Sequence, residues 1–163
     1  MAKFKPTTKL PDKPSALIRL AIDDITKVEQ MKTKYKIDMD TWHQPATTVT
    51  DPNDFNYEYS ANHDPKKRCA VCLAGSVMAC TLKVDPTLDV TTDNFDKDTE
   101  NKLDAIDAFR CGDLHHAFET LGLAKKFPRY LMDEIEMVDY SSSPKKFKEE
   151  QLHLADVLEA LGF

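Results

Sequence analysis

An uncharged run from Cys69 to Leu82, CAVCLAGSVMACTL, constrains the fold of this sequence more than any other feature. Apolar or small residues would lie on every side of a helix formed by this run, so other elements must surround it. A membrane-spanning helix needs about 20 apolar residues, and this run is shorter. We therefore predict a central, buried helix at about 69–83, with Gly75 packed closely against a neighbouring helix or an aromatic ring.

Amphipathic helices are predicted on both sides of this run. Apolar residues from Leu17 to Val28 recur at helical spacing, which predicts a helix over about 15–34. Near the end of the chain, Ser143 followed by Pro144 is typical of a helix cap and a first helical residue, and begins the last helix.

The most acidic stretch, from Asp85 to Asp107, leads into two helices separated by a break. Asp96 suits the start of the first helix, because a negative charge and a side-chain acceptor both stabilise a helix N-terminus. Gly112 is expected to end this helix and Asp113 to begin the next one.

Together these patterns predict an all-α fold, a compact bundle of five or six helices around the central helix. Residues 1–14 are rich in proline and lysine and are expected to form an extended arm, followed by a single helical domain at 15–163. The alternating segment FNYEY at 55–59 indicates a short hairpin near 46–60. The chain of 163 residues is long enough to bury a core without disulfides or metal.

The charge balance excludes several classes of partner. A net charge of −6 gives no general attraction to nucleic acid or to an anionic membrane. The first residues, MAKFKPTTKLPDKP, contain basic residues but no apolar signal segment. We therefore expect a cytoplasmic protein that binds neither nucleic acid nor membrane.

The long irregular stretch at 45–65 provides the first candidate binding site. Loops of this length are kept in compact domains mainly when they cover or bind something. Aromatic and basic residues in and around this loop would together form an aromatic patch with a cationic rim, suited to an acidic protein surface or a small phosphorylated ligand. The alternative is that the aromatics seal the core, with Trp42 as a core anchor and His43 as an ordinary boundary histidine. The candidate residues are Trp42, His43, Phe55, Tyr57, Tyr59, Lys66, Lys67 and Arg68.

The cysteines provide a second candidate site. Cys69 and Cys72 form a C-x-x-C pair, and with Cys111 and His115 they would make a tetrahedral zinc set. The same thiols could serve as a redox pair, or one of them as a nucleophile beside a histidine. Cysteine is also among the most buried residue types, and Gly112 interrupts the helix between Cys111 and His115. We therefore expect reduced thiols and no metal or other cofactor.

Two segments also carry a resemblance. The segment DMDTWH at 38–43 and the box CAVCLAGSVMA at 69–79 resemble a family of small uncharacterised proteins encoded by tailed bacteriophages. An acidic stretch and a Leu/Phe helix broken by a Gly-Asp pair, here Gly112 and Asp113, extend the resemblance over about 15–122. The resemblance implies a bacteriophage origin and no particular chemistry.

Taken together, these observations favour a non-enzymatic phage accessory protein that binds a host protein or a small defence-related ligand. One alternative is a metal- or thiol-dependent enzyme that uses Cys69, Cys72, Cys111 and His115. A second alternative is a small virion or assembly component.

Overall fold

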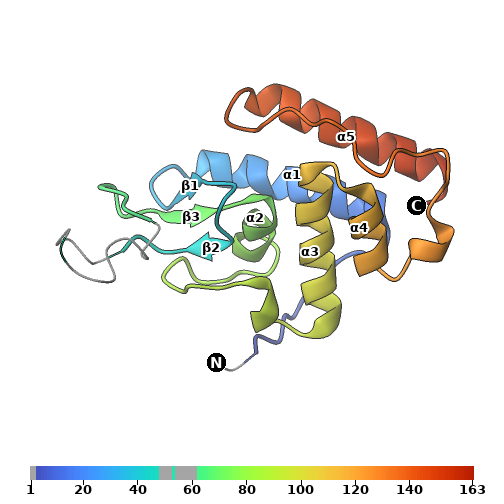
Figure 1. Cartoon of the computed structure of the whole chain (residues 1–163). Helices are drawn as coiled ribbons and strands as arrows, with labels where there is room; N and C mark the ends of the chain where they lie inside the picture. Colours follow the sequence, from blue (N-terminus) through green and yellow to red (C-terminus); the bar gives the residue numbers. More distant parts are fainter. Residues whose placement is uncertain (1–2, 48–52, 54–61) are drawn as a thin grey trace. The chain divides into compact units, whose positions relative to one another are not determined.

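The computed structural model describes residues 3–47, 53 and 62–163, and this part of the chain is mainly helical (Figure 1). It contains five α-helices and one small three-stranded sheet. The helical class is confirmed, but the all-α prediction is not, because of the sheet. The predicted hairpin near 46–60 falls almost wholly outside the described residues. Among the described residues, no helix has both the length and the apolar character needed to cross a membrane.

The chain divides into two compact units. Unit 1 comprises Met1–Asp23 and Thr92–Phe163, and unit 2 comprises Asp24–Thr91. Helix α1 (Pro14–Gln30) begins in the first unit and ends in the second, and starts and stops within a few residues of its predicted bounds.

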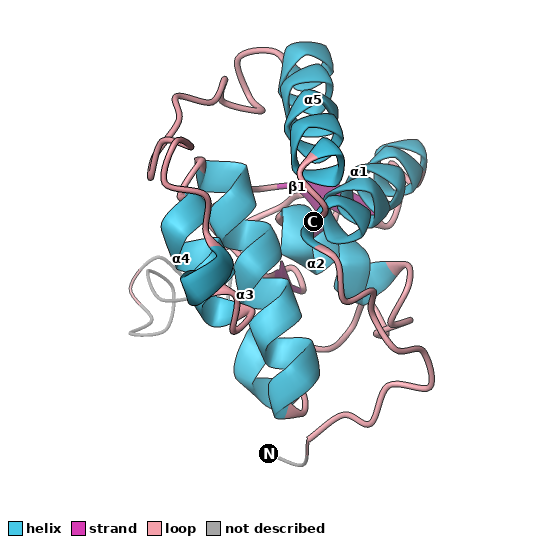
Figure 2. Cartoon of the chain, turned by 90° about the vertical axis from the view of Figure 1, so that its right-hand side faces the viewer, coloured by secondary structure: helices cyan, strands magenta, loops and turns pink. Residues whose placement is uncertain are grey.

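Unit 1 contains the helices α3 (Lys97–Cys111), α4 (Leu114–Thr120) and α5 (Pro144–Ala160), together with short 3-10 turns at Thr92–Asn94 and Ala124–Lys126. Figure 2 shows α3 and α4 side by side. Phe118 of α4 is fully buried, and its ring lies 6.4 Å from that of Phe109 and 4.9 Å from that of Phe163. Aromatic side chains of α3, α4 and the C-terminal residue therefore pack together in the core of unit 1.

The ends of these helices follow their local sequence. Gly112 ends α3 in the left-handed conformation, with φ of 79°, and Asp113 caps α4 by accepting a hydrogen bond from the backbone N–H of His116. Ser143 caps α5 in the same way, and Pro144 is its first residue. Asp96 occupies the N-cap of α3, but its side chain makes no capping hydrogen bond. Asp96 therefore stabilises the N-terminus of α3 through its negative charge and not through a side-chain hydrogen bond.

The N-terminal arm contains no helix from residue 3 to residue 13, but it is tied to unit 1. The buried ammonium group of Lys102 donates to the carbonyl of Leu10 at 2.9 Å and to the carboxylates of Asp12 at 2.9 Å and Asp98 at 3.0 Å. Nearer the start, the N–H of Phe4 donates to the carbonyl of Asn94. The arm is therefore held by one buried charge and by backbone pairing.

Unit 2 contains the sheet. Its strands are β1 (Tyr35–Ile37), β2 (His43–Gln44) and β3 (Cys69–Val71), in the order β1-β3-β2. β3 pairs with β1 in parallel and with β2 in antiparallel fashion. The predicted helix at 69–83 is therefore wrong at its start, where residues 69–71 form a strand, and at its end, where residues 80–83 are not helical. A central strand buried on both faces needs an apolar residue at every position, and a buried helix has the same composition, so periodicity does not separate them.

Helix α2 is short, Leu73–Ala79, and its residues from Leu73 to Met78 are all buried. The thiol of Cys72 caps it by accepting a hydrogen bond from the N–H of Gly75 at 3.3 Å. Gly75 lies against the backbone carbonyl of Trp42, whose oxygen would collide with a β-carbon at position 75. The expected close contact at Gly75 is therefore present, but its partner is the backbone of an aromatic residue and not the ring.

Candidate functional site

The first predicted site is divided by the structure. His43 is fully buried in β2, where its Nδ1 lies 2.7 Å from the carbonyl oxygen of Leu88. Burial lowers the pKa of His43, which keeps the imidazole neutral. Trp42 is only half-buried, and its backbone carbonyl packs against Gly75 of α2. His43 therefore cannot contribute to a binding surface. The aromatic residues Phe55, Tyr57 and Tyr59 lie outside the described residues.

The basic run that follows the loop is also divided. Lys66 and Lys67 are exposed, whereas Arg68 is half-buried and its Nε lies 2.7 Å from a carboxylate oxygen of Asp64. The Arg68 side chain donates hydrogen bonds to the Asp64 carboxylate, and so do the backbone N–H groups of Arg68 and Lys66. These bonds hold the pKa of Asp64 down to about 2. Of the three predicted cations, two face solvent and one has a structural ion pair.

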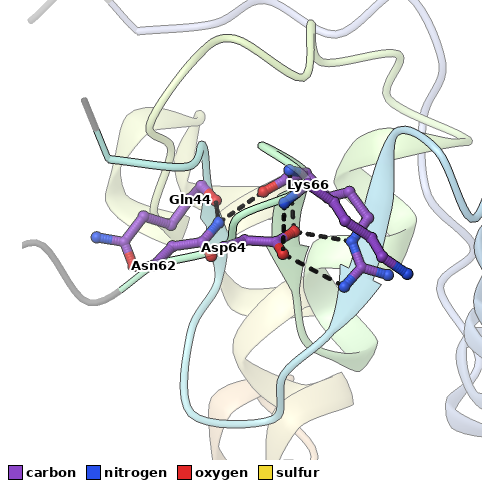
Figure 3. Close-up of polar contacts among 5 residues, drawn as sticks. Gln44, Asn62, Asp64 and Lys66 are labelled. Atoms are coloured by element: carbon purple, nitrogen blue, oxygen red, sulfur yellow. Dashed lines mark hydrogen bonds and ion pairs between the residues drawn. The ribbon is translucent and has the colours of Figure 1, made fainter. Parts of the chain in front are cut away.

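Asn62 fastens the two sides of the loop (Figure 3). Its amide nitrogen donates to the carbonyl of Gln44 at 3.0 Å and to that of Arg68 at 2.7 Å. The backbone carbonyl of Asn62 accepts the N–H of Thr47 at 2.8 Å. These contacts join the described residues on either side of residues 48–61 and act as a structural clamp.

The predicted zinc ligands are distributed over both units. Cys69 and Cys72 belong to unit 2, and Cys111 and His115 belong to unit 1. Across the residues that the structure describes, no group of three or more His, Cys, Asp or Glu side chains is placed to hold a metal ion. The four cysteines, all of them described, form no disulfide.

One Cys–His pair does form, between Cys69 and His43, but it lacks the features of a catalytic dyad. The Cys69 sulfur lies 3.7 Å from Nδ1 and 3.8 Å from Nε2 of the imidazole, so it is not directed at one nitrogen in preference to the other. Both residues are buried, and burial together with the negative charge of Asp89 raises the pKa of Cys69 to about 12. A thiol with that pKa is protonated at neutral pH and is not a nucleophile.

An open, largely apolar cavity in unit 1 provides a further candidate site. A segment from Tyr130 to Met137, which we call the strap, lies beside α5, and the two enclose a groove of about 600 Å³. Figure 1 shows the chain running back along α5 after the 3-10 turn at Ala124–Lys126. The apolar lining from the strap consists of Tyr130, Leu131, Met132, Ile135 and Met137, and the apolar lining from the helices consists of Leu114, Leu154 and Val157.

Two side chains of the strap are strongly exposed for their type. Tyr130 is 73% exposed and Met132 is 68% exposed. Large apolar side chains left in water beside an apolar groove mark an interaction site more often than scattered surface residues do. We call this site the α5 groove.

Charged side chains surround the α5 groove unevenly. The described lining contains three carboxylates, Glu136, Glu149 and Glu150, and one cation, Lys146. Two further acidic residues, Asp133 and Glu134, are exposed on the same strap. The rim is therefore net negative, while the floor is apolar.

Backbone contacts hold the strap in place. The N–H of Ile135 donates to the carbonyl of Gly112, and the N–H of Leu114 donates to the carbonyl of Asp133. A β-carbon on residue 112 would collide with the carbonyl oxygen of Ile135, so Gly112 is needed both for its positive φ and for this close approach. On the other side, the carboxylate of Glu150 accepts the N–H of Val138 at 2.8 Å.

The sequence patterns gave no indication of the α5 groove because the strap has neither a helical nor an alternating period. The available signal was compositional: YLMDEIEMV combines large apolar residues with acidic ones and follows Pro128 without a capping pattern. An apolar segment without a period cannot be assigned to the face of any element, and such a segment is a candidate for a partly exposed surface.

Comparison of the chain with protein-family models, with curated proteins and with solved structures gave no match.

Proposed function

We propose that the protein is a non-enzymatic binding protein and that it holds a protein partner in the α5 groove. The observation that carries this proposal is the exposure of Tyr130 and Met132 beside an apolar groove of about 600 Å³. Tyrosine and methionine are enriched at protein interfaces, where their burial contributes much of the binding free energy.

The chemistry of the groove supports binding over catalysis. Its interior is supplied by aliphatic, methionine and tyrosine side chains, and the described lining contains no cysteine. Two thiols of the alternative enzyme hypothesis, Cys69 and Cys72, are buried in unit 2. A groove of this kind offers a partner apolar surface but no activated nucleophile.

The resemblance to bacteriophage proteins favours a host protein as the partner, and with it a phage accessory role. A small phosphorylated ligand is less suited to this groove, since three carboxylates against one lysine would repel a phosphate. The exposed Lys66 and Lys67 in unit 2 remain the better place for such a ligand.

Binding of the neutral apolar dye Nile red tests whether the groove accepts apolar groups. The double variant Tyr130→Ser/Met132→Ser removes the exposed apolar side chains of the groove. The control variant Leu88→Ser/Leu152→Ser removes two exposed leucines that do not line it. We expect the first variant to lose most of the dye fluorescence and the control to keep it, with the free energy of unfolding of both near that of the wild type. Equal fluorescence from both variants would overturn the proposal.

A further inference from the structure

We propose that the α5 groove takes a basic amphipathic helix, a short helical segment of another protein with one apolar face and lysine or arginine beside it. This inference rests on the proposed function and specifies the chemistry of its partner.

The wall of the groove that α5 forms favours a helical occupant. Residues Lys146, Glu149, Glu150, His153, Leu154 and Val157 line the groove, and they recur on α5 at intervals of three or four. They form a single stripe over about three turns, roughly 16 Å long at 1.5 Å per residue. A second helix packs against such a stripe by placing its own side chains at the same intervals into the spaces between the ridges.

The opposite wall is adaptable. The strap contains no regular helix or strand, and it contributes Met132 and Met137 to the groove. Methionine is unbranched and polarisable, so it adjusts to apolar side chains of different shape. The strap therefore accommodates a range of leucine, isoleucine or phenylalanine positions on the occupant.

The charge of the rim selects the flanking residues. Glu136, Glu149 and Glu150 lie on both sides of the apolar floor, Glu136 on the strap and the other two on α5. Carboxylates placed this way attract lysine or arginine on the edges of an apolar helix face and repel glutamate or aspartate. The same charge disfavours an anionic membrane surface, to which a basic groove would be suited.

Fluorescence anisotropy of three labelled peptides of about 14 residues, roughly four helical turns, tests the proposal. The first peptide has leucines at helical spacing with lysine elsewhere, and the second has glutamate in place of lysine. The third has the composition of the first with leucine and lysine alternating, which suits a strand and not a helix. We expect the first to bind at least about tenfold tighter than either of the others, and to weaken as salt is raised.

Reversing charges on the rim tests whether the rim selects the lysine peptide. The variant Glu136→Lys/Glu149→Lys should lose affinity for the lysine peptide and gain affinity for the glutamate peptide. The matched control Glu119→Lys/Asp89→Lys makes the same change in net charge at exposed positions outside the groove lining, and it should bind as the wild type does. If both variants lose affinity equally, the overall charge and not the rim selects the peptide, and the inference fails.

Other occupants give different results. Nile red binding without a preference for the lysine peptide would overturn this inference and leave the proposed function standing, with a protein partner of different chemistry as the occupant. Failure of Nile red and of all three peptides would overturn both. A dimer in sedimentation that Met132→Lys abolishes would assign the groove to a second copy of this chain, and would also overturn the basic-helix proposal.

Discussion

The carbonyl oxygen of Trp42 occupies the space that a β-carbon at position 75 would need. This contact joins the chain just before β2 to the first turn of α2. One partner is a backbone carbonyl and the other is a glycine, which has no side chain. Neither can turn aside as a long side chain would. The position of this one oxygen atom therefore requires glycine at residue 75.

Replacing Gly75 with alanine tests this contact. We expect a loss of about 1–3 kcal/mol in the free energy of unfolding, the usual cost of an overpacked core, measured by urea denaturation. Alanine in a helix is otherwise more stable than glycine by about 0.5–1 kcal/mol, so the sign of the change separates the two effects. A Gly75→Ala variant at least as stable as the wild type would show that the contact with Trp42 has no energetic effect.

Gly112→Ala connects the fold to the α5 groove. The substitution forces a non-glycine residue into the left-handed conformation, at about 1–2 kcal/mol, and drives its β-carbon against the carbonyl of Ile135. We expect weaker Nile red binding at temperatures where the variant is still folded, because the strap is displaced. Undiminished dye binding by the folded variant would show that the groove does not depend on this attachment.

The ion pair of Asp64 with Arg68 predicts a dependence of stability on acid pH. The pKa of Asp64 is lowered from 3.8 to about 2, mainly by hydrogen bonds from Arg68. A lowered pKa in the folded state contributes stability above the ordinary value, and this contribution is lost as pH falls from about 4 to about 2. Over that interval Asp64→Asn should lose stability less steeply than the wild type in thermal unfolding. Asp40→Asn, which changes an exposed aspartate of the same unit, should follow the wild type.

The four thiols should differ in their reaction with iodoacetamide at pH 8. Cys111 is exposed, whereas Cys69 and Cys72 are each only 2% exposed and the pKa of Cys69 is raised to about 12. We expect mass spectrometry to find Cys111 modified first, with Cys69 and Cys72 modified only after unfolding in urea. Early modification of Cys69 in the native protein would restore the possibility of a nucleophilic role.

Sequence alone predicted the features that depend on local chemistry. Gly112, Asp113 and the pair Ser143 and Pro144 mark their helix ends because each satisfies or interrupts the backbone within a few residues. The strand at Cys69–Val71 was predicted as helix because its partners, Tyr35–Ile37 and His43–Gln44, are distant in the sequence.

The candidate sites also depend on contacts between residues that are distant in the sequence. The predicted loop site assumed that neighbours in sequence share a surface, yet His43 turns inward to the carbonyl of Leu88. The α5 groove depends on residues 114, 130–137 and 146–157 meeting, and that meeting is set by the attachment at Gly112. No local pattern encodes such a contact.

The clamp made by Asn62 has a consequence for how this sequence can change over generations. Because Asn62 joins Gln44, Thr47 and Arg68, the two ends of the 48–61 segment are fixed by contacts outside it. Lengthening a closed loop is inexpensive, at about 0.6 kcal/mol for each doubling. Insertions and deletions between Thr47 and Asn62 should thus be tolerated by unit 2, which makes this segment the place where homologous lineages can diverge in length while the sheet is inherited unchanged.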